Sequence, residues 1–68
     1  MRITTYEDVL CNTGIKREER DTWVRDDSVV MVTMPGGDEG LVYVDGLRNP
    51  LRVSASTATE IGTKVLGL

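Results

Sequence analysis

The segment spanning residues 29–53 most limits what this chain can fold into, because it is the densest in branched apolar side chains. Residues 29–34 are apolar on both alternating faces, which is typical of a strand that is central in a sheet or covered by a partner. Residues 35–40 hold a proline and three glycines, a composition typical of a turn. Residues 41–44 and 51–54 have the composition of two further strands. The segment therefore predicts a three-stranded antiparallel β-meander.

The residues before the meander predict two short helices. Thr5, followed by acidic residues in the next turn, is typical of a helix N-cap, and Gly14 suits the position just after a helix end. These two positions predict a helix over residues 6–12. The charged segment 16–27 has oppositely charged residues at i,i+4 spacing, which favours a solvated second helix. We expect Trp23 to be buried and to hold this second helix against the sheet.

The C-terminal residues predict a third helix. Thr57 and Glu60 fit a capping box, and Gly67 suits the helix end. Between them, one apolar stripe at helical spacing is formed by Ala58, Ile61, Val65 and Leu66. The expected element order is therefore α-α-β-β-β-α, which is a small single α+β domain over residues 1–68.

The composition argues against catalysis. The 68-residue chain has no histidine, so the commonest general base and metal ligand is missing. Its one cysteine, Cys11, has no histidine to activate it, and its paired acids are sequence neighbours that offer no shared site on a helix. Neither a phosphate-loop nor a calcium-loop pattern is present. We therefore expect no enzymatic activity, no catalytic residue, no cofactor and no metal site.

Composition also bears on compartment and on charge. A lone cysteine makes a reducing compartment the default, and the longest apolar run, residues 29–32, is far shorter than a membrane span. We expect a cytoplasmic protein with no membrane partner, or a virion protein if the chain is phage-encoded. Residues 1–40 carry five basic and nine acidic side chains, a balance of −4. This balance opposes the approach of a polyanion.

One stretch has a more specific pattern, in which two predicted helices are followed by a hairpin with a glycine-rich tip. Within it, Asp8-Val9, Thr13-Gly14-Ile15 and Trp23-Val24-Arg25 resemble the corresponding positions of MerR-type regulators and phage excisionases. The resemblance implies a winged helix-turn-helix that binds DNA, with the second helix in the major groove and residues 35–40 as the wing tip. The DNA contacts that it implies are Lys16, Arg17, Arg20 and Arg25.

We rank a non-catalytic protein-interaction or assembly module above this DNA-binding alternative. Small size, a thin aliphatic core and a strand that is apolar on both faces all favour a protein partner or a homo-oligomer. Chains of this character are typical of phage and mobile-element accessory proteins, which are virion components or stoichiometric inhibitors. The partner interface expected from the sequence consists of Val29, Met31, Tyr43 and Leu68.

Overall fold

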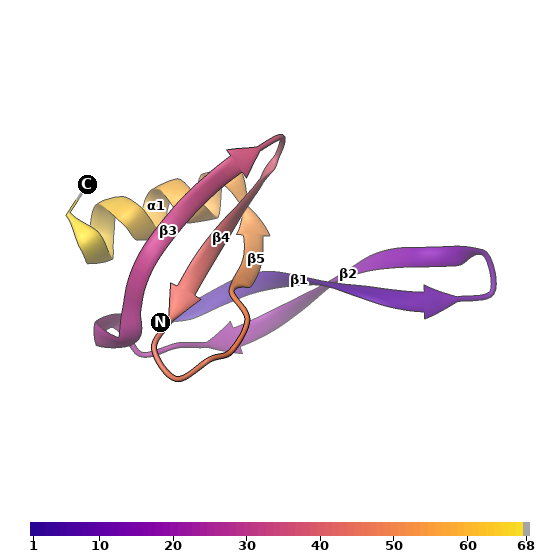
Figure 1. The fold of residues 1–68 in the computed structure, drawn as a ribbon, viewed down its shortest axis with the longest axis horizontal. Coiled ribbons are helices and arrows are strands. Elements are labelled where there is room, and N and C mark those ends of the chain that lie inside the picture. Colours follow the sequence, from indigo (N-terminus) through magenta and orange to yellow (C-terminus); the bar gives the residue numbers. More distant parts are fainter. Residues whose placement is uncertain (68) are drawn as a thin grey trace.

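The computed structural model describes residues 1–67, which form one antiparallel sheet of five strands and one α-helix. The elements in chain order are β1 (Arg2–Cys11), β2 (Gly14–Trp23), the 3-10 helix η1 (Asp26–Ser28), β3 (Val29–Gly36), β4 (Glu39–Val44), β5 (Leu51–Ser54) and α1 (Ala55–Leu66). The strands lie in the order β2-β1-β5-β4-β3, so β2 and β3 are the two edges of the sheet. Figure 1 shows α1 packed on one face of this sheet.

The predicted order α-α-β-β-β-α is wrong in its N-terminal half. The residues predicted as two helices, 6–12 and 16–27, lie mostly in β1 and β2, which pair in one unbroken register from Arg2↔Trp23 to Cys11↔Gly14. Gly14 has a φ of 121°, a value that glycine adopts without strain, and it closes a two-residue turn instead of ending a helix. Of the charged residues that suggested helical i,i+4 pairs, Arg17 instead pairs across strands with Glu39, and Arg25 pairs with Asp27, two residues along the chain.

The segments predicted as the three strands of a meander are strands in the structure. β3 pairs with β4, and β4 pairs with β5, in each case antiparallel. β5 then pairs with β1 at a single position, Tyr6↔Arg52. This one pair joins the N-terminal hairpin to the meander and makes a single sheet of five strands.

Helix α1 lies where the sequence predicts a helix, but its N-cap differs from the expected one. The Ser54 hydroxyl accepts a hydrogen bond from the backbone N–H of Thr57 at 3.2 Å, so Ser54 is the cap and Thr57 lies inside the first turn. Gly67 ends the helix in the left-handed conformation with φ 70°, as the sequence predicts.

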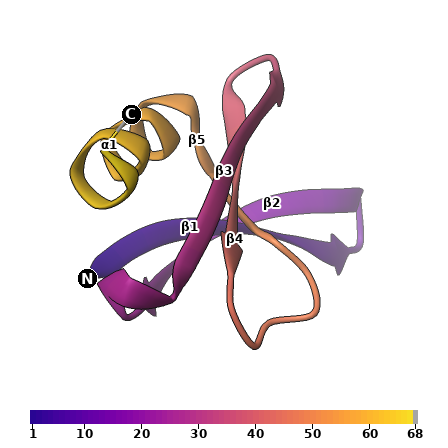
Figure 2. The same cartoon turned by 60° about the vertical axis from the view of Figure 1, so that its left-hand side comes forward.

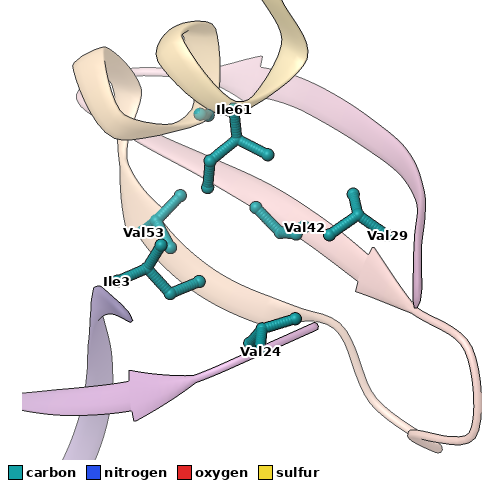
Figure 3. Close-up of a cluster of buried hydrophobic side chains, with 7 residues drawn as sticks. Ile3, Val24, Val29, Val42, Val53 and Ile61 are labelled. Carbon is teal, nitrogen blue, oxygen red and sulfur yellow. The ribbon is translucent and has the colours of Figure 1, made fainter. Parts of the chain in front are cut away.

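The core lies between α1 and the face of the sheet that it covers (Figure 3). Its buried members are Ile3, Val24, Val29, Val42, Val53, Ala58 and Ile61. Gly40 sets the distance between helix and sheet, because a Cβ built at Gly40 would overlap the Cβ of Ala58.

Trp23 does not anchor its segment against the sheet as expected, since its side chain is 77% exposed. Alternate strand residues point to opposite faces, and at this end of β2 the neighbouring Val24 is the buried one.

Candidate protein-interaction surfaces

The outer part of the β1–β2 hairpin, residues 7–20, is called the arm here because it extends away from the rest of the molecule (Figures 1 and 2). Within residues 1–67, β1 pairs with the meander at Tyr6 alone. Beyond Tyr6, the two strands of the arm pair with each other. The arm makes the molecule elongated, with extents of 42 × 24 × 18 Å.

Four charged side chains at the root of the arm form the arm-base network, namely Asp8, Arg17, Glu39 and Arg52. Arg52 donates two hydrogen bonds to Glu39, from Nε at 3.0 Å and from Nη2 at 3.2 Å, and its Nη1 lies 3.0 Å from Oδ2 of Asp8. Arg17 donates to Oε2 of Glu39 at 2.9 Å. The network therefore ties β1 and β2 of the arm to β4 and β5 of the meander.

Electrostatics and an aromatic contact support this arrangement. Hydrogen bonds from Arg52 and Arg17 hold the pKa of Glu39 below its ordinary value, so the carboxylate stays charged in mildly acidic solution. The hydrogen bond to Glu39 raises the pKa of Arg17 in turn. The Arg17 guanidinium also lies 4.4 Å from the centroid of the Tyr6 ring, which is within the range of a cation–π contact. The ion pairs hold the base of the arm against β4 and β5.

The tip of the arm is apolar and exposed. Leu10 and Ile15 lie opposite each other across the two strands and are 82% and 75% exposed. Cys11 beside them is also exposed, and a hydrogen bond with the Thr13 hydroxyl lowers the pKa of its thiol. These paired aliphatic side chains at the end of the arm bury little of their surface against residues 1–67.

A second apolar region surrounds Trp23 at the opposite end of the hairpin. Trp23 and Leu47 line a groove of about 350 Å³ between the end of β2 and the loop that follows β4. The Arg2 guanidinium lies 6.0 Å from the centroid of the Trp23 ring, at the outer limit of a cation–π contact. The Trp23 ring that lines the groove is therefore held by this weak contact with Arg2.

A third apolar region is the free edge of β3. Val30, Met31 and Met34 are large exposed hydrophobic residues of this strand, and within residues 1–67 no strand pairs with its outer side. Val32 and Met34 also line a groove of about 240 Å³ along α1. β3 thus presents unpaired backbone and apolar side chains together.

The cations expected to contact DNA do not share one surface. Arg17 lies on the face of β2 opposite to Lys16 and Arg20, because alternate strand residues point to opposite faces. Arg17 is paired with Glu39, Arg20 with Glu7 at 2.8 Å and Arg25 with Asp27 at 3.2 Å. The second helix that would carry them into a major groove is a strand in the structure.

The expected protein interface is brought together in part. Met31 and Tyr43 lie opposite each other on β3 and β4 and keep exposed surface, whereas Val29 is buried in the core and is not accessible. Leu68 lies outside the described residues. Sequence reasoning missed Leu10 and Ile15, for which the available signal was their equal distance from the turn at residues 12–13.

No group of three or more His, Cys, Asp or Glu side chains among residues 1–67 is arranged to hold a metal ion. In the same part of the chain, no helix has the length and apolar character needed to cross a bilayer.

Comparison with protein families, curated proteins and solved structures finds no match to this chain. Residues 1–67 thus form a small α+β fold with three exposed apolar regions.

Proposed function

We propose that this chain is a non-catalytic protein-interaction module that presents the arm tip to a protein partner. The observation that carries the proposal is the exposure of Leu10 and Ile15, which face each other at the end of the arm. Exposed apolar patches in small proteins commonly mark sites of interaction. Fully burying two aliphatic side chains of this size contributes about 1.5–3 kcal/mol each, which is the scale of an interface hot spot.

The arm-base network supports the proposal because it makes the arm a fixed projection. A hairpin joined to its domain through one strand pair would otherwise sample many directions. Binding would then cost additional conformational entropy, whereas a pre-ordered arm avoids that cost. Bidentate contact between Arg52 and Glu39 is the geometry that gives such pairs their directionality.

The chemistry of the arm favours a protein partner over a nucleic acid. The aliphatic side chains of Leu10 and Ile15 at its tip offer dispersion and burial, and neither can donate a hydrogen bond to a phosphate. Its arginines, Arg17 and Arg20, are engaged by Glu39 and Glu7. A virion component that docks on a neighbouring subunit and a stoichiometric inhibitor that inserts into a groove are both roles that such an arm suits.

The test is affinity capture from the organism that encodes the chain, with three tagged forms. The arm variant Leu10→Glu/Ile15→Lys replaces the apolar pair with an oppositely charged cross-strand pair, which keeps the hairpin stable and leaves the net charge unchanged. The matched control is Val30→Lys, which alters the edge of β3 and not the arm. We expect wild type and control to retain a stoichiometric protein that the arm variant loses.

Two outcomes would refute the proposal. One is the absence of any stoichiometric protein on the wild-type chain. The other is equal capture by the wild type and by an arm variant whose circular dichroism shows an intact fold.

A further inference from the structure

The two edges of the sheet differ sharply in charge. β2, at one edge, carries six consecutive charged residues at positions 16–21. β3, at the other edge, has the sequence VVMVTMPG and carries none. Charged side chains on an edge strand are a common means of preventing edge-to-edge pairing. One edge is therefore protected by charge and the other is open.

The open edge is self-complementary. If β3 pairs antiparallel with its own copy about Val32, Val30 lies opposite Met34 of the second copy and Met31 lies opposite its Thr33. Val30 is 61% exposed and Met34 is 50% exposed, so each would cover the other. No charged residue lies within residues 30–34 of either copy, although the chain as a whole has a net charge of −3.

The surroundings of β3 define the extent of this pairing. Register shifts against β4 lie between Val29 and Met31 at the start of the strand and between Thr33 and Gly36 at its end. Pro35 has no backbone N–H to donate near that end. The usable segment is residues 30–34, about 17 Å of strand. On the side that faces α1, the groove lined by Val32 and Met34 lies beside the new strand and would receive side chains from it.

We propose that two copies of this chain form a twofold-symmetric dimer by antiparallel pairing of β3 with β3, which extends the sheet from five strands to ten. The second copy is the occupant because β3 offers an uncharged strand that matches itself and no charged group that would select another ligand. An interface built on five residues per strand is at the small end for specific association, so the expected dissociation constant is roughly 10–100 µM. The proposal deepens the proposed function, because it names one partner for an interaction module, but it uses a different surface from the arm.

Sedimentation velocity over the range of about 2–500 µM tests the dimer. Wild type and the arm variant Leu10→Glu/Ile15→Lys are expected to shift from monomer to dimer with the same midpoint. Val30→Lys, which places a lysine on the exposed edge, is expected to weaken dimerisation more than about 30-fold. Should Val30→Lys fail to fold, Met31→Lys on the opposite face of the same strand serves in its place.

Hydrogen exchange of the wild-type chain gives a readout that needs no substitution. Amides within residues 30–34 should gain protection at high concentration, whereas those of the arm at residues 7–20 should not. A wild-type chain that stays monomeric at about 500 µM overturns the dimer. So does a folded Val30→Lys variant that dimerises as well as wild type, or protection gained on the arm alone. If the chain does not dimerise but still captures a partner through the arm, this inference is refuted and the proposed function stands.

Discussion

Replacing Gly40 by alanine tests how closely α1 packs on the sheet. The new Cβ would overlap the Cβ of Ala58 and would lie 3.1 Å from Sδ of Met34 and 3.4 Å from the carbonyl oxygen of Thr33. Met34 can move because its side chain is flexible and half-exposed, but Ala58 is fixed to the helix. Overpacking of this kind costs about 1–3 kcal/mol, and the lower backbone entropy of the unfolded alanine chain offsets about 0.5–1 kcal/mol. We expect a net loss of about 1–2 kcal/mol.

The reciprocal change makes the prediction specific. Ala58→Gly alone removes one buried methyl group, worth about 0.8 kcal/mol, and adds a helical glycine, which costs about 1 kcal/mol. The double variant Gly40→Ala/Ala58→Gly restores the space and should be no less stable than Ala58→Gly alone. Urea unfolding followed by circular dichroism measures all four proteins. Additive losses, within about 0.5 kcal/mol, would show that the two residues do not touch.

Two further predictions concern side chains at the surface. Trp23→Ala should change the free energy of unfolding by less than about 1 kcal/mol because the ring is exposed, and a thermal melt showing a loss of about 3 kcal/mol or more would place it in a core. Glu39→Gln should lower the melting temperature at neutral pH, since Glu39 loses its charge-assisted bonds to Arg52 and Arg17. Because folding lowers the pKa of Glu39 from its ordinary value of 4.5, its stabilisation is present above that pH and is lost as the pH falls through the lowered value. The difference between variant and wild type should therefore shrink in melts below about pH 4, and a constant difference down to pH 2 would contradict the reasoning.

The meander and the C-terminal helix could be predicted because both segments concentrate the apolar side chains that form the core. Residues 29–34 and 41–44 supply the branched side chains that form the centre of the core, and Val42 is fully buried. The stripe that includes Ala58 and Ile61 faces the sheet as its helical spacing predicts. Burial against the sheet imposes a helical period on α1 that can be read from the sequence, whereas the strands of the meander are recognisable by their branched apolar composition.

The hairpin was missed because most of it buries nothing. An arm outside the core needs no apolar alternation, so β2 has the composition of a solvated segment, and its charges are compatible with helical spacing and with cross-strand pairing alike. The distinguishing signal is symmetry about the turn at residues 12–13, which places Asp8 opposite Arg17 and Leu10 opposite Ile15. Helical i,i+4 pairing draws on residues of one segment, whereas this symmetry relates two segments of equal length.

The unequal edges of the sheet bear on what kind of assembly the chain can form. A sheet with two open edges adds copies at both ends and grows into a fibre, which is the usual hazard of unprotected strands. Here the charged residues at positions 16–21 of β2 oppose pairing at one edge, and the uncharged β3 permits it at the other. Pairing of β3 with β3 uses the open edge of each copy and leaves a charged β2 at both ends of the ten-stranded sheet. Twofold pairing of this type closes on itself, so the same difference in charge that permits a dimer also stops growth beyond it.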